Sequence, residues 1–155
     1  MTEREKMMKG LLYDANFDPE LLRQRTECKE LCYDYNHTRP SDEEKRTEIL
    51  KRLFKATGEH LTIEQPFVCD YGYNISVGEG FFANYNLVIL DPAPVTFGDN
   101  VFIAPNCSFT TASHPLDAER RNKGLETCKP IHVGNNVWIG ANVVVLPGVT
   151  IGDNA

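Results

Sequence analysis

A single histidine in the segment FTTASHPLD, His114, is the side chain of this sequence whose type and setting best suit chemistry. An imidazole that titrates near neutrality can remove a proton from a hydroxyl while that hydroxyl attacks an acyl carbon. A lone histidine is more often an inert surface group. His114 differs because it stands at the mouth of the only long interruption in an otherwise regular repeat. We therefore take His114 as a candidate general base.

Two further side chains are expected on the outside of the repeat region. His132 and Trp138 each alternate with inward-facing neighbours, so both point away from the core. An exposed tryptophan on such a face is either an interface residue or a wall of a ligand site, and both readings stay open. A metal-dependent hydratase would need three imidazoles converging on zinc, whereas only His114 and His132 lie in this region. We expect no metal.

The repeat that carries these residues has a period of six and begins near residue 61. Six of its eleven first positions precede a glycine, where average glycine usage of about 7% predicts roughly one. Each unit reads as a short strand followed by a corner, which predicts a parallel β-helix rather than a β-sandwich, whose turns do not recur at a fixed spacing. The first positions are residues 71, 77, 83, 89, 97, 103, 109, 133, 139, 145 and 151.

The interruption is the segment PLDAERRNKGLETCKP, residues 115–130, after which the register resumes in phase at Val133. We expect an extruded loop without regular structure, held at its ends by Pro115 and Pro130. Long loops of this kind in compact domains are usually functional. Ser113 is expected to point inward, which leaves His114 outside the core.

The residues before the repeat, 1 to about 58, are expected to be helical. Asp18 followed by Pro19 reads as a helix start, and Ser41 with Glu44 has the form of a capping box, with Gly58 as the stop. These helices are amphipathic and need a surface to cover. The sequence thus predicts a helical cap over 1–58 and a β-helix over 59–155.

Composition narrows the function further. A net charge of −6 argues against a nucleic-acid partner, and the charged N-terminus and the lack of a long apolar run predict neither a signal peptide nor a membrane span. Five cysteines without a C-x-x-C pair indicate reduced thiols, hence a cytoplasmic protein. Cys28 and Cys32 can share a helix face. We favour core packing for them over a metal or redox role.

With these features in hand, the sequence resembles the maltose and galactoside O-acetyltransferases. The resemblance is carried by YGYNISVGEGFFANYN, IAPNCSFTTASHPLD, VGNNVWIGANVVVLPGVTIGDNA and the N-terminal EKMMKGLLYDANFDPELLRQR. It implies a left-handed β-helix assembled as a homotrimer, with active sites in the clefts between subunits. It also implies transfer of acetyl from acetyl-CoA to a sugar hydroxyl by direct attack in a ternary complex.

The resemblance assigns roles to particular residues. His114 matches the family's general base, Ala141 a position whose backbone touches CoA, and Trp138 borders the same channel. Asp91 followed by Pro92 looks more like the maltose branch than the galactoside branch. The positions that contact the acceptor sugar are matched by Asp14, Asp70, Asn84 and Asp91. The cations that we expect near the CoA phosphates are Arg120, Arg121, Lys123 and Lys129.

Members of this family continue for several hexads beyond the point that corresponds to Ala155. From the sequence we therefore expect a β-helix that is incomplete at its C-terminus. The alternative function is a non-catalytic trimeric β-helix that binds a ligand, its activity lost with the missing coils. The sequence does not specify the acceptor sugar or alcohol.

Overall fold

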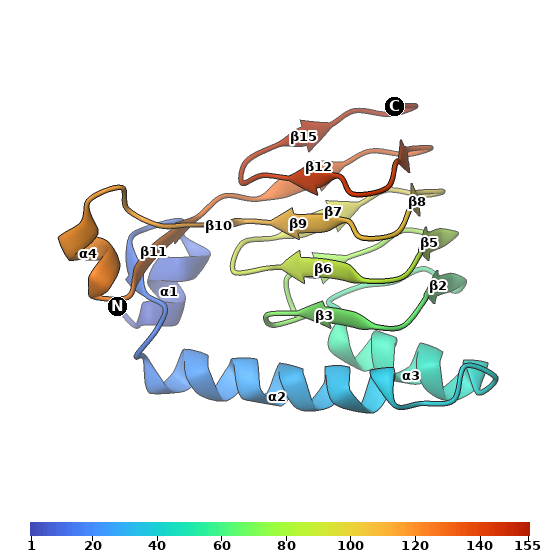
Figure 1. Cartoon of the computed structure of the whole chain (residues 1–155), viewed down its shortest axis with the longest axis horizontal. Helices are drawn as coiled ribbons and strands as arrows, with labels where there is room; N and C mark the ends of the chain where they lie inside the picture. Colours follow the sequence, from blue (N-terminus) through green and yellow to red (C-terminus); the bar gives the residue numbers. More distant parts are fainter.

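A computed structural model describes residues 1–155 and shows a stack of β-coils with helices along its first coil and to one side (Figure 1). The N-terminal elements are α1 (Glu3–Met8), β1 (Tyr13–Asp14), α2 (Pro19–Asn36) and α3 (Glu43–Leu53). None of the helices combines the length and the apolar character that crossing a bilayer would require.

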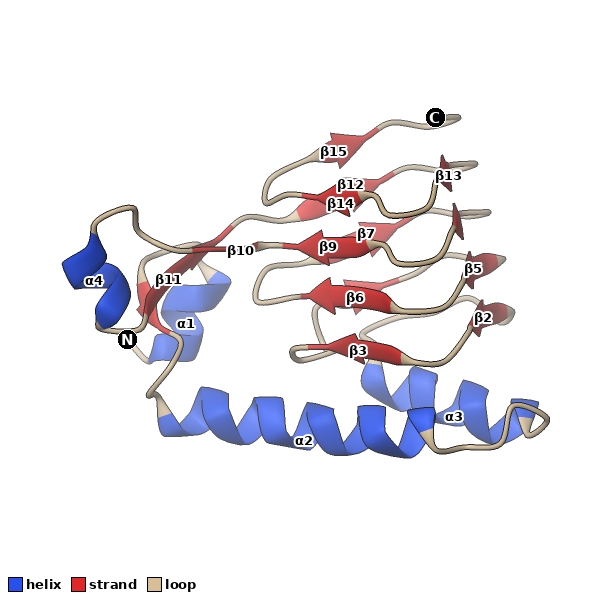
Figure 2. Ribbon diagram, in the orientation of Figure 1, coloured by secondary structure: helices blue, strands red, loops and turns tan.

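The coils build a prism with three parallel sheets, each of four strands, and the expected left-handed β-helix is confirmed (Figure 2). One sheet runs in the order β15 (Thr150–Ile151), β12 (Ile131–Val133), β7 (Val95–Phe97), β4 (Ile75–Ser76). The second has β13 (Trp138–Ile139), β8 (Phe102–Ile103), β5 (Phe81–Ala83), β2 (Leu61–Ile63). The third has β14 (Val144–Val145), β9 (Ser108–Thr110), β6 (Leu87–Leu90), β3 (Phe67–Cys69).

The period of six follows from this packing. The first position of every unit is buried except Ile151 in the last coil, which is half-buried. Phe81 on β5 and Phe97 on β7 of the second coil meet edge to face with ring centroids 5.0 Å apart, and Phe97 meets Phe109 on β9 of the third coil at 5.1 Å. A column of interior side chains therefore holds the coils in register.

The corners stack as regularly as the strands. The Oδ1 atom of Asp99 accepts from the backbone N–H of Glu79, and Oδ1 of Asn135 accepts from that of Asp99. Next to this ladder, Asn100 and Asn136 adopt positive φ angles of 55° and 57°, a conformation that asparagine tolerates better than most residues. The triplets 98–100 (Gly-Asp-Asn) and 134–136 (Gly-Asn-Asn) thus form corners of the kind that the period of six predicts.

The helices α2 and α3 cover the first coil (Figure 1). The α2 residue Asn36 pairs its side-chain amide with both the N–H and the carbonyl of Phe67, which satisfies part of the exposed edge of β3. Asp18 caps α2, as predicted. The prediction of a capping box at Ser41 is wrong, because Asp42 caps α3 and its side chain accepts from the Lys45 N–H. The prediction that this helix ends at Gly58 is also wrong, since α3 ends at Leu53.

The interruption is not an irregular loop, and that expectation is wrong. It contains α4 (Ala118–Asn122) and β11 (Leu125–Cys128), and β11 pairs antiparallel with both β10 (Ala112–Ser113) and β1. This small sheet diverts the chain from the stack, so Ser113 is exposed rather than inward. The coil then resumes with β12 directly beside β7, which explains the preserved phase.

Candidate active site

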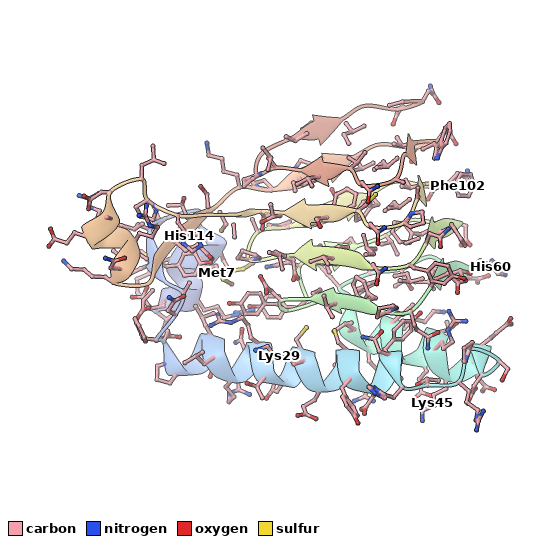
Figure 3. The ribbon with its side chains drawn as sticks, in the orientation of Figure 1. Met7, Lys29, Lys45, His60, Phe102 and His114 are labelled. Carbon is pink, nitrogen blue, oxygen red and sulfur yellow. The ribbon has the colours of Figure 1, made fainter.

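A cavity of about 400 Å³ lies where the small antiparallel sheet leaves the β-helix. Four polar side chains face it from different elements, so only the folded chain brings them together. His114 follows β10, Glu126 lies on β11, Asp70 follows β3 and Arg25 projects from α2. Figure 3 shows His114 beside the loop that carries α4, on the opposite side of the stack from Phe102.

His114 is placed with its ring half exposed, as predicted from its position after the last regular strand. Its Nδ1 atom lies 3.4 Å from the carbonyl oxygen of Leu125. Because a carbonyl can only accept a hydrogen bond, this contact favours the tautomer with the proton on Nδ1 and leaves Nε2 as a proton acceptor. Nε2 in turn lies 3.8 Å from Oε1 of Glu126.

Two carboxyl groups share the cavity and affect one another. Burial raises the pKa of Asp70 to about 6, and the negative charge of Glu126 adds to that rise. Burial also raises the pKa of Glu126, while the Tyr13 hydroxyl, which donates a hydrogen bond to it, lowers it. Each of these two acids therefore keeps its proton to higher pH than an exposed carboxyl group of the same type would.

Arg25 joins the cavity to the structure around it. Its guanidinium donates to the Tyr71 hydroxyl at 2.8 Å and to the carbonyl oxygen of Ala15 at 2.7 Å. Its positive charge lowers the pKa of Asp70 against the effect of burial. A planar donor beside two acids gives the cavity both signs of charge, which suits a ligand rich in hydroxyl groups.

Of the predicted sugar contacts, Asp70 lines the cavity and Asp91 does not. Asp91 is fully buried, and its two oxygens accept from the backbone N–H groups of Tyr71 and Gly72 at 2.9 and 2.8 Å. It also accepts from the N–H of Asp70 at 3.1 Å. In this chain Asp91 therefore positions the segment that carries Asp70. Asp14 lies one residue before the cavity-lining Ala15, and its side chain accepts from the Phe17 N–H.

The remaining predicted residues lie away from His114. Asn84 and Ala141 occupy corners that follow β5 and β13, and Trp138 stands on β13 with 75% of its surface exposed. Trp138 faces outward as predicted and pairs in register with Phe102, which Figure 3 places far from His114. Within one chain, the predicted CoA contacts and His114 do not meet.

Three residues at or next to the cavity were not predicted from the sequence: Arg25, Glu126 and Tyr13. Arg25 is one of several charged residues on a helix, and nothing local distinguishes it. No local pattern marks Glu126 either, because the segment LETC reads apolar, polar, polar, apolar and does not alternate as a half-buried strand does. Of the expected cations, Arg121 donates to the carbonyls of Pro115 and Leu116, and Lys123 pairs with Glu119.

No group of three metal-ligating side chains includes a histidine. His132 bonds through Nδ1 to the Thr96 hydroxyl on the neighbouring coil, at 2.7 Å, and His114 has carboxylate and carbonyl neighbours. The three-imidazole site that a zinc hydratase requires is therefore not formed within one chain.

Comparison with known proteins agrees with this architecture. Residues 6–58 match the family described as a maltose acetyltransferase hexapeptide capping motif, and residues 130–155 match the bacterial transferase hexapeptide repeats. A Saccharomyces cerevisiae protein named as an acetyltransferase is 51% identical over 97% of this chain and 77% of its own length.

Solved structures extend the similarity to three dimensions. A maltose O-acetyltransferase from Clostridium difficile 630 is 50% identical with a TM-score of 0.97, covering 99% of this chain and 82% of its own. A galactoside acetyltransferase in complex with coenzyme A is 44% identical with a TM-score of 0.94, covering 99% and 76%. On this evidence the chain belongs to the maltose and galactoside O-acetyltransferase family of hexapeptide-repeat acetyltransferases.

Proposed function

We propose that this protein transfers an acetyl group from acetyl-CoA to a hydroxyl of a sugar, with His114 as the general base. The observation that carries the proposal is the placement of a half-exposed imidazole at a polar cavity, with Nδ1 next to a carbonyl and Nε2 free to accept a proton. The family relationship supports acetyl-CoA as the donor, because the related galactoside enzyme was solved with coenzyme A.

The proposed reaction is a direct attack in a ternary complex. The acceptor oxygen forms a bond to the acetyl carbon while its proton passes to Nε2 of His114. The carbon–sulfur bond of the thioester then breaks, and the imidazolium returns the proton to the departing thiolate. Glu126, 3.8 Å from Nε2, lies where it stabilises the positive charge on the ring between these two steps.

The acceptor is proposed to be a sugar because of what lines the cavity. Asp70 and Glu126 offer acceptors and Arg25 offers donors, a combination that pairs with several hydroxyl groups at once. The choice among maltose-, glucose- and galactoside-like acceptors is part of the test. All five cysteines are free, which fits a reducing cytoplasm, where we place the reaction.

The complete site is proposed to lie between subunits of a homotrimer. Trp138 and Phe102 form an aromatic column on one sheet, 75% and 51% exposed. This column lies on the side of the prism opposite His114 (Figure 3). Such a column is costly to leave in water. A neighbouring copy would bring the side of the prism with Asn84 and Trp138 to face His114 and so complete the cleft.

The test compares His114→Ala with His60→Ala, an exposed histidine on the opposite side of the stack. We expect turnover to fall about 10²- to 10⁴-fold in the first variant and to stay near wild type in the second. Binding of CoA, measured by equilibrium dialysis, should persist in both. Turnover of His114→Ala within a few-fold of wild type would show that His114 is not the base. Failure of the wild-type protein to bind CoA at millimolar concentration would instead favour the non-catalytic binding protein.

A further inference from the structure

Three buried thiols converge between the helical cap and the first coil. Cys28 and Cys32 lie one turn apart on α2, and Cys69 ends β3. The Sγ atom of Cys69 is 3.5 Å from that of Cys28 and 4.0 Å from that of Cys32, and all three sulfurs lie within 4.8 Å of one another. The residues are 2%, 4% and 7% exposed. The proposed transfer reaction makes no use of them.

The separations suit one atom bound to all three sulfurs. For a triangle with sides of 3.5 and 4.0 Å and a third side of up to 4.8 Å, the point equidistant from the corners is at most about 2.4 Å from each. A thiolate bond to a soft closed-shell ion such as zinc is about 2.3 Å. The sulfurs therefore need almost no movement to become a three-ligand set.

The surroundings provide an entry path but no fourth ligand. A cavity of about 290 Å³ opens beside Cys28, between α2 and Tyr71. Asp91, whose negative charge acts on Cys28 and Cys69, has its oxygens occupied by backbone N–H groups of the turn after β3. Zinc is almost always four-coordinate in protein sites, so this pocket of three sulfurs does not fit it well.

Charge decides among the ions that accept three sulfurs. Three thiolates with monovalent copper carry a net charge of −2, with zinc −1, and with trivalent arsenic zero. Burying an uncompensated charge is expensive, and no cation of the protein contacts these sulfurs.

We propose that Cys28, Cys32 and Cys69 form a binding site for trivalent arsenic, taken up as arsenous acid. Three As–O bonds break and three As–S bonds form, and each thiol proton leaves with a hydroxide as water. No electrons are transferred and no charge is created. The bound arsenic links α2 to the end of β3. The next residue after Cys69 is the cavity residue Asp70.

The test measures arsenic retained by the intact protein after dialysis against arsenite without added thiols. One arsenic per chain is expected for wild type and for Cys107→Ala, a control whose buried thiol lies in a distant corner and contacts the Gly140 carbonyl. Loss of even an outer partner of a metal ligand costs about tenfold or more, so Cys69→Ala should weaken binding at least that much. Equal retention by Cys69→Ala and Cys107→Ala, or no retention by wild type, would overturn the proposal.

Two measurements on the wild-type protein remain decisive if Cys69→Ala does not fold. X-ray absorption at the arsenic edge should count three sulfur neighbours, and two or fewer would contradict the site. A parallel dialysis against zinc should leave less than one zinc per chain, because three sulfurs do not complete the set of four ligands that zinc usually takes. Stoichiometric zinc with no arsenic bound would refute the charge argument. Neither measurement depends on acetyl transfer.

Discussion

The Glu126 carboxylate is expected to accelerate the reaction by stabilising the charge that His114 acquires. Opposite unit charges at the observed 3.8 Å attract by about 1 kcal/mol in water-like surroundings and about 4 kcal/mol at an effective dielectric of 20. Glu126 is 13% exposed but the His114 ring is 51% exposed, so the lower end applies. A loss of about 1 to 2 kcal/mol in Glu126→Gln corresponds to a fall in kcat of about five- to thirtyfold.

The assay is steady-state turnover at about pH 8, above the pKa of about 6 of Asp70. Glutamine keeps the size of the side chain, and its carbonyl can still accept from the Tyr13 hydroxyl. Glu119→Gln is the matched control, because it removes the same charge from an exposed position on α4. The difference in kcat between the two variants should become smaller in high salt, because salt screens the attraction between Glu126 and the half-exposed His114 ring.

A second measurement on Glu126→Gln comes from Asp70. Because the charge of Glu126 adds to the burial that raises the pKa of Asp70 to about 6, its removal should lower that pKa. The rise of KM for the acceptor in acid should then begin at lower pH than in wild type. A kcat equal to that of Glu119→Gln would refute the electrostatic role. A loss beyond about 10³-fold would mean that Glu126 itself moves the proton, which would also refute it.

Two further predictions concern stability. In Gly98→Ala the new Cβ would lie 2.2 Å from Oδ1 of Asn135 and 2.8 Å from the Gly134 carbonyl oxygen. This overpacking should lower the free energy of unfolding by about 1–3 kcal/mol, which a lower midpoint of urea unfolding would show. Gly140→Ala, where nothing lies within 4 Å, should stay within about 0.5 kcal/mol of wild type, and equal effects of the two substitutions would contradict the tight contact between coils. Asp70, with its pKa raised to about 6, binds its proton more tightly in the folded protein than in the unfolded chain. This difference stabilises the fold fully below about pH 4, and the stabilisation is lost as the pH rises through 6. The free energy of unfolding of wild type should therefore fall by up to about 2 kcal/mol relative to Asp70→Asn between pH 4 and pH 7, and parallel pH profiles would count against this assignment.

The sequence by itself determined the coils. Local rules suffice there, because each six-residue unit repeats the same strand, the same inward aliphatic side chain and the same turn. The buried first positions from Tyr71 to Val145 and the outward Trp138 were therefore predictable. So was the exposed imidazole of His114, from its place beside the interruption.

Only the tertiary structure decided the cavity and the thiol cluster. Their members lie on α2, β3, β10 and β11, and no spacing along the chain relates Arg25 to Glu126 or Cys28 to Cys69. The interruption was misread for the same reason: β11 is too short to stand alone and exists because β1 and β10 flank it. Asp91 shows that residue type alone does not determine a side chain's role. Its carboxylate could bind a sugar hydroxyl, but in the folded chain it accepts hydrogen bonds from four backbone N–H groups.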